Sequence, residues 1–271
     1  MKANYFAALP LLLMNPAAGV VLFSDNFDTS DQRLNDELPP LASRISGTLT
    51  GDLALTSHRA HQLIVGNQLQ GVATAGFRFE NTTFLGAADR YDWAAGATGG
   101  NILTAGGFNV TFEWIAPDGA PDPTQWVAWT VGTNNADSGA SVVNEAANDY
   151  GILFRVNGDT QRFDNGSPLT SANGAFSTAS NTHVVSIDFS LSSWADGSNV
   201  TATSFVDGTQ VANDSFQLDG NGGAFFMEFA TNNTGSLIDN LTVSTLETIP
   251  EASSILLSGV ALFVFLARRS R

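Results

Sequence analysis

Apolar and polar residues alternate along most of the chain between residues 20 and 247. Successive side chains of a strand point to opposite faces, so a two-residue period is typical of a strand with one buried face. The stretch from Phe108 to Trp114 is a clear example, because Phe108, Val110, Phe112 and Trp114 are separated by smaller or polar residues. The main strands predicted from apolar content and alternation are residues 108–114, 127–131, 152–156, 185–191, 225–230 and 237–243.

The segments between these strands are typical of turns and loops. Asp207 and Gly208 separate two apolar stretches, and Asp-Gly tolerates the positive φ angles of a tight hairpin. Residues 94–101, 134–141 and 164–173 are rich in Gly, Asn, Ser, Asp and Thr and are expected to be loops. Many short strands with few helix signals predict an all-β fold, an antiparallel β-sandwich of the jelly-roll type. No fixed-period repeat or linker divides it, so residues 20–247 are expected to form one domain.

Residues 1–19 have the parts of a secretory signal peptide. Lys2 supplies the positive charge, residues 5–14 are apolar, and small residues occupy positions 17–19. Ten apolar residues are too few for a membrane span. Cleavage is therefore expected near Gly19.

Residues 248–271 form a second segment that differs from the body. Residues 253–267 are apolar and carry no charge, and Arg268, Arg269 and Arg271 follow them. As a helix, this apolar stretch is about 22 Å long, which is short for a stable anchor of about 20 residues. Terminal arginines favour the cytoplasmic side, so a transmembrane helix here places the body outside the membrane.

Pro250 and Glu251 precede this short span, and the three-part tail resembles the PEP-CTERM sorting signal of Gram-negative bacteria. Ala252 stands where that motif has its second proline. The resemblance implies that the secretion machinery and an exosortase-type enzyme act on the chain. It implies a precursor tethered to the inner membrane, and then delivery to the cell surface or extracellular matrix.

The charge of the chain is strongly acidic. It has 11 basic and 26 acidic residues and a net charge of -15. Four of the basic residues lie at the two ends, which leaves seven in the body, all arginine. Such a body repels phosphate backbones, so no nucleic acid partner is expected. The chain has no cysteine, which excludes disulfides and thiolate chemistry.

Sequence signatures of common enzymes are missing. The chain has no Gly-x-Ser-x-Gly or His-Glu-x-x-His motif, and its only lysine is Lys2. Glycoside hydrolysis uses a pair of carboxylates, whereas Glu113 and Glu228 are isolated in their predicted strands and are expected to be solvated. The chain is therefore predicted not to be an enzyme.

Three stretches in the body resemble the concanavalin A-like lectin/glucanase jelly roll, which includes laminin-G-like domains. They are residues 25–28 (Asp-Asn-Phe-Asp), 205–209 (Phe-Val-Asp-Gly-Thr) and 238–243 (Ile-Asp-Asn-Leu-Thr-Val). First and last strands of a jelly roll often lie side by side, which brings Asp25 or Asp28 near Asp239. The resemblance implies a structural Ca²⁺ at that place; the alternative is that Asp239 and Asn240 only form a turn.

Three tryptophans in or beside polar segments, Trp93, Trp126 and Trp194, are candidates for stacking on sugar rings. Together these features predict an exported, non-catalytic surface or matrix protein that binds or organises polysaccharide. Two alternatives remain open. One is a glycoside hydrolase or polysaccharide lyase with an unfamiliar site, and the other is a purely structural or adhesive surface protein.

Overall fold

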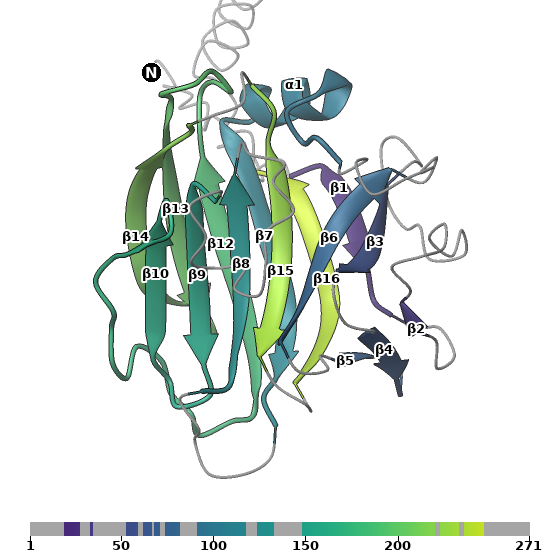
Figure 1. Cartoon of the computed structure of the whole chain (residues 1–271), viewed down its shortest axis with the longest axis vertical. Coiled ribbons are helices and arrows are strands. Elements are labelled where there is room, and N and C mark those ends of the chain that lie inside the picture. Colours follow the sequence, from purple (N-terminus) through teal and green to yellow (C-terminus); the bar gives the residue numbers. More distant parts are fainter. Residues whose placement is uncertain are drawn as a thin grey trace, which may run out of the picture.

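The computed structural model describes residues 19–27, 33–34, 53–58, 62–66, 68–70, 74–81, 91–117, 124–132, 148–219, 223–232 and 236–246. Within these ranges the chain forms two antiparallel β-sheets that pack face to face, as Figure 1 shows, together with one helix. The predicted antiparallel β-sandwich is therefore confirmed. Residues 1–18 of the predicted signal peptide, the whole predicted sorting tail (248–271) and Asp28 lie outside the described residues.

The larger sheet, called sheet A, contains the first and last strands. Its order is β14 (Thr209–Gln217), β13 (Asn199–Val206), β12 (Thr182–Ser190), β7 (Gly107–Ile115), β16 (Leu237–Thr245), β5 (Gln68–Gln70), β4 (Gln62–Val65) and β2 (Arg33–Leu34), and β1 (Val21–Asp25) also pairs with β16.

The smaller sheet, called sheet B, covers one face of sheet A (Figure 1). Its order is β11 (Ser167–Pro168), β10 (Thr160–Asp164), β9 (Tyr150–Arg155), β8 (Trp126–Gly132), β15 (Phe226–Asn232), β6 (Thr74–Asn81) and β3 (Leu53–His58). Every strand predicted from the sequence overlaps a strand of one of the two sheets.

The core lies between the sheets and consists of the apolar half of each alternating strand. Phe108, Val110, Phe112 and Trp114 of β7 are all 0% exposed. Phe112 meets Phe229 of sheet B edge to face, with ring centroids 5.2 Å apart. Burying each such side chain stabilises the fold by about 1.5–3 kcal/mol, so the alternation that predicts the strands also supplies their driving force.

The predicted hairpin at Asp207 and Gly208 joins β13 to β14 and is confirmed. Both residues have positive φ, at 51° and 75°. The Asp207 carboxylate also accepts a hydrogen bond from the backbone N–H of Val184, at 2.9 Å, and lies 2.8 Å from Nδ1 of the buried His183. The hairpin is thereby fixed to the neighbouring strand β12.

One of the predicted loops is wrong, and another, residues 134–141, lies outside the described residues. Residues 94–101 were expected to be irregular because of their glycines, but helix α1 spans Gly96–Thr104. Glycine disfavours helix, so tertiary contacts decide this segment. Ile102 is fully buried, and a Cβ on Gly99 would lie 2.0 Å from the Ala94 carbonyl oxygen, so only glycine fits there.

The two ends of the described sandwich meet at one corner. The Val20 N–H donates to the Thr245 hydroxyl at 2.8 Å, and the Thr245 N–H donates to the Val20 carbonyl at 2.9 Å. Strand β1 pairs with β16 in antiparallel register, as expected for first and last strands. Among the described residues there is no helix long and apolar enough to cross a membrane; the predicted span at 253–267 lies outside them.

Candidate functional site

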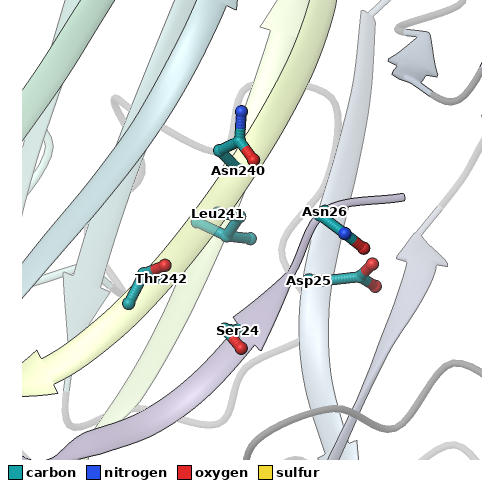
Figure 2. A pocket seen from close by; sticks show the side chains of 6 residues that line it. All are labelled: Ser24, Asp25, Asn26, Asn240, Leu241 and Thr242. Carbon is teal, nitrogen blue, oxygen red and sulfur yellow. The ribbon is translucent and has the colours of Figure 1, made fainter. Parts of the chain in front are cut away.

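A polar pocket lies where β1 meets β16, at the place predicted for a metal site (Figure 2). It has a volume of about 270 Å³. Its lining residues are Ser24, Asp25, Asn26, Asn240, Leu241 and Thr242. The pairing of first and last strands therefore does bring Asp25 close to the Asp239–Asn240 segment, with Asp25 opposite Leu241.

The two described aspartates of the predicted site form local turns. One carboxylate oxygen of Asp25 accepts the backbone N–H of Phe27 at 2.8 Å, and Phe27 has a positive φ of 53°. One carboxylate oxygen of Asp239 accepts the backbone N–H of Asn240 at 2.7 Å, and Asn240 has a φ of 51°. Each side chain thus stabilises a backbone conformation that is unfavourable for most residue types.

The side chains of Asp25 and Asp239 also lie on opposite faces of sheet A. Asp25 shares a face of β1 with the buried Phe23, two residues before it, and Figure 2 shows its side chain on the side of β1 away from Thr242. Ile238 and Leu241 both face the core, because β16 is irregular between Asp239 and Thr242. Asp239 is left on the outer face.

Ca²⁺ requires six to eight oxygen ligands around one point. No group of three or more His, Asp or Glu side chains that could hold a metal occurs among the described residues. Asp25 and Asp239 therefore do not fit the structural Ca²⁺ that the resemblance implies, and the remaining candidate ligand, Asp28, lies outside the described residues.

Two of the three tryptophans proposed for sugar stacking are buried, which corrects that prediction. Trp93 is 0% exposed and meets Phe79 edge to face, with ring centroids 5.1 Å apart. Trp194 is 8% exposed, packs on Phe225 and donates its indole N–H to the Gly99 carbonyl at 3.2 Å. Neither ring presents a face to solvent.

Trp126 differs from these two, because it is only half-buried. It lies at the start of β8, opposite Arg155, and packs against a small apolar cluster. That cluster contains Ala128, Leu153, Phe163 and Ala230, all on sheet B. Of the three candidates, Trp126 is the only one that is not in the buried core.

The two strand glutamates have different surroundings. Glu228, which was expected to be solvated, is 3% exposed on β15. Glu113 is half-buried on the outer face of sheet A, opposite Asp239, and its carboxylate accepts the Asn240 side-chain amide at 3.2 Å. Glu113 and Asp239 therefore face each other on the outer side of sheet A, and neither lines the pocket of Figure 2.

The outer face of sheet A carries a second polar arrangement, formed by side chains that the sequence analysis did not single out. Two rows of facing residues cross strands β12, β7 and β16. One row is Asp188–Asn109–Ser244, and the other is Ser186–Thr111–Thr242. These six residues are called the polar face below. The only sequence signal for them is the polar half of the alternation in each strand.

Hydrogen bonds connect the polar face between β7 and β12. The Asn109 side-chain N–H₂ donates to Oγ of Ser186 at 2.8 Å and to Oδ1 of Asp188 at 2.6 Å. The Thr111 hydroxyl donates to Oδ1 of Asn109 at 2.7 Å. Strands β1, β7, β12, β13, β14 and β16 contain no lysine or arginine, so no basic side chain of these strands neutralises Asp188.

No family model matches the chain, and no curated protein matches it. Among solved structures, it is similar to the carbohydrate recognition domain of Emp46p in its potassium-bound form, with a TM-score of 0.49, 8% identity, and coverage of 79% of this chain and 96% of that one.

Two further solved structures are similar over a comparable share of the chain. The lectin UEA-II complexed with galactose has a TM-score of 0.42 and 9% identity, over 80% of this chain and 98% of that one. The exoplasmic/lumenal domain of VIP36 in its Ca²⁺/Man3GlcNAc-bound form has a TM-score of 0.43 and 8% identity, over 75% and 89%. These scores and identities are low, so the description of the fold rests on the strand pairing alone.

Proposed function

We propose that the chain is an exported, non-catalytic surface or matrix protein whose β-sandwich binds neutral polysaccharide. The observation that carries this proposal is the polar face of sheet A. It presents hydroxyl, amide and carboxylate groups at the regular spacing of neighbouring strands, about 4.8 Å apart. Such groups donate and accept the hydrogen bonds that sugar hydroxyls make.

The charge of the chain limits the kind of polysaccharide. With a net charge of -15, the protein repels anionic polymers at long range. Neutral polymers escape this repulsion. Because the polar face crosses three neighbouring strands, an extended polymer can contact several strands at once.

Binding of the full chain to immobilised polysaccharides tests the proposal. We expect binding to at least one neutral polysaccharide and weaker binding to acidic ones. The double variant Thr111→Val/Thr242→Val keeps the side-chain shape but removes two hydroxyls of the polar face, so it should bind at least about tenfold more weakly. Thr170→Val, at an exposed site that follows β11 of sheet B, is the matched control and should bind like the wild type.

Two results would contradict the proposal in different ways. Failure to bind any polysaccharide would leave the structural or adhesive alternative. Release of soluble sugar from a polysaccharide would favour the hydrolase or lyase alternative. In that case Glu113→Gln should abolish release, because Glu113 and Asp239 are the described carboxylates that face each other on neighbouring strands of sheet A.

Export and sorting form the second part of the proposal. The signal peptide, the Pro250–Glu251 pair, the apolar stretch at 253–267 and the terminal arginines support it. The meeting of Val20 with Thr245 is consistent with it, because both flanking segments then start from one corner of the sandwich. Only a few residues separate Leu246 from the apolar stretch, which keeps this corner close to the membrane in a tethered precursor.

Mass spectrometry of both ends tests this part. The proposal expects a chain that begins near Val20, and, in the medium or on the cell surface, a form that ends near Pro250. Recovery of the intact Arg271 end from every fraction would argue against exosortase-type sorting and for a plain membrane anchor.

A further inference from the structure

A second cavity lies at the end of the polar face, on the corner where the first and last described segments meet. It has a volume of about 420 Å³. Its lining residues are Gly19, Asn109, Asp188, Ser244, Thr245 and Leu246. All three residues of the Asp188–Asn109–Ser244 row therefore line it, and it shares no described lining residue with the pocket of Figure 2.

We propose that this corner cavity binds a single unit of a neutral sugar, with Asp188 and Ser244 as its hydrogen-bonding residues. The inference rests on the proposed polysaccharide binding and names the subsite at which one sugar unit is recognised. The other row of the polar face, Ser186–Thr111–Thr242, lies beside it and lines no part of the cavity.

The carboxylate of Asp188 is held in place by its neighbours. Asn109 uses one side-chain N–H for Oδ1 of Asp188 and the other for Oγ of Ser186. The Asn109 amide is in turn oriented by the Thr111 hydroxyl, which donates to its Oδ1. A group fixed before binding loses less conformational freedom when a ligand arrives, and this favours affinity.

Two groups in the cavity remain available for a ligand. Within the described residues, no hydrogen bond reaches Oδ2 of Asp188 or Oγ of Ser244. Oδ2 accepts hydrogen bonds only, whereas a serine hydroxyl both donates and accepts. A ligand hydroxyl that donates to Asp188 makes a charge-assisted bond, roughly twice as strong as a neutral one.

The spacing of these groups fits one sugar ring. Asp188 and Ser244 both face Asn109, from strands on either side of β7. They are separated by two strand spacings, about 10 Å, so they cannot bond each other. Each can bond one edge of a ring that lies over Asn109. Leu246 also lines the cavity and adds an apolar residue, which suits the C–H groups of a sugar.

The charge of the cavity selects among sugars. Among the described residues that line it, Asp188 is the only charged one. A uronic acid or a sulfated sugar would place a second negative charge beside this carboxylate, which costs free energy. A neutral sugar supplies donors without that cost.

Nuclear magnetic resonance of the ¹⁵N-labelled full chain tests the inference. Methyl glycosides of mannose, glucose and galactose are titrated one at a time, and the side-chain amide signals of Asn109 are followed. We expect these signals to shift with at least one neutral glycoside and not with glucuronic acid. The amide signals of Asn213, which lies on β14 outside the cavity, should stay in place.

Two variants locate the interaction. Asp188→Asn keeps the shape and the oxygen that Asn109 contacts but removes the charge, so sugar affinity should fall at least about tenfold. Ser244→Ala removes only one hydroxyl and should weaken binding by a smaller factor. Asp164→Asn makes the same carboxylate-to-amide change on sheet B and should leave sugar affinity unchanged.

The outcomes distinguish the sugar subsite from the wider binding of polysaccharide. No Asn109 shift with any neutral glycoside, a shift with ammonium or calcium chloride alone, or equal affinity of Asp188→Asn and wild type would overturn the inference. If the wild type binds polysaccharide and Asp188→Asn binds it equally well, the proposed function stands and this subsite falls. A glycoside shift at Asn109 without any polysaccharide binding supports the cavity and contradicts the wider function.

Discussion

Asp214 makes a polar contact between the two sheets, and its removal should destabilise the sandwich measurably. It lies on β14 of sheet A, where its Oδ2 accepts the hydroxyl of Tyr150 of sheet B at 2.9 Å. The same oxygen lies 3.5 Å from Nε of Arg162, also on sheet B. Tyr150 is fully buried and stacks on Phe216, with ring centroids 5.0 Å apart. The perturbation to make is Asp214→Ala.

The magnitude follows from what each partner loses. A buried hydroxyl without an acceptor costs about 1–3 kcal/mol. Arg162 loses an ion pair but still donates to the Thr170 carbonyl at 3.0 Å from Nε, so its loss is smaller. We expect a total of about 2–3 kcal/mol. At about 2–4 °C per kcal/mol for a domain of this size, the melting temperature should fall by about 4–12 °C.

The assay is thermal and urea unfolding at pH 7 of wild type, Asp214→Ala, Tyr150→Phe and the double variant. Tyr150→Phe keeps the ring on Phe216 and removes only the hydroxyl. The two changes should not be additive, because the second removes a bond that the first has already broken, and a coupling of at least about 1 kcal/mol is expected. A fall of less than about 2 °C for Asp214→Ala, or full additivity, would refute this reasoning.

Four other predictions can be checked by unfolding measurements on the same protein. Burial, and after it the charge of Asp214, raises the pKa of Tyr150 well above its usual value. The stability that the neutral Tyr150 hydroxyl contributes should therefore be complete below about pH 10 and lost at higher pH. Tyr150→Phe should reduce this loss of stability at alkaline pH. Burial first, and then the charge of Asp219, raise the pKa of Asp164, so Asp164→Asn should raise the melting temperature at pH 7 and lose this advantage near pH 3. Gly107→Ala should lower the free energy of unfolding by at least about 2 kcal/mol, because a Cβ would lie 2.0 Å from a backbone oxygen at a φ of 147°. Gly100→Ala in helix α1, where a Cβ meets open space, should raise the free energy of unfolding by up to about 1 kcal/mol. Adding millimolar Ca²⁺ should leave the melting temperature unchanged, and a clear rise would show that residues outside the described ranges complete a metal site.

The strands were predictable because one physical cause acts on each of them separately. In β7 the burial of Phe108, Val110, Phe112 and Trp114 is complete, and this is the alternation that the sequence displays. The hairpin at Asp207 was predictable for a similar reason, since the positive φ angles of its two turn residues limit the choice of amino acids. In both cases the information lies within a few consecutive residues.

Predictions that depended on how distant segments pack were less successful. Trp93 and Trp194 lie in polar segments and are predicted to be exposed, yet Trp93 packs on Phe79 and Trp194 on Phe225. Helix α1 likewise forms against propensity. The polar residues around these aromatic rings satisfy the loop backbone, so they do not indicate that the ring itself is solvated.

The metal site predicted from the sequence shows how one local irregularity changes a prediction. With a strict two-residue period, Asp239 would share the core-facing side of β16 with Leu241 and Val243. The irregularity after Asp239, with Asn240 at a φ of 51°, turns it to the outer face instead. Such an irregularity depends on one residue adopting an unusual backbone conformation. Asparagine tolerates this conformation but also occurs in regular strands, so its presence in the sequence does not predict the irregularity.

The polar face could not be predicted, for a topological reason. Asn109 and Asp188 are 79 residues apart, and they face each other only because β7 pairs with β12 in sheet A. Alternation marks the polar side chains of each strand as outward-facing but carries no information on strand order. No role can therefore be assigned to short polar residues on a strand surface until the neighbouring strands are known. Once Asp188, Asn109 and Ser244 are aligned across three strands around one cavity, the same residues become a specific chemical hypothesis.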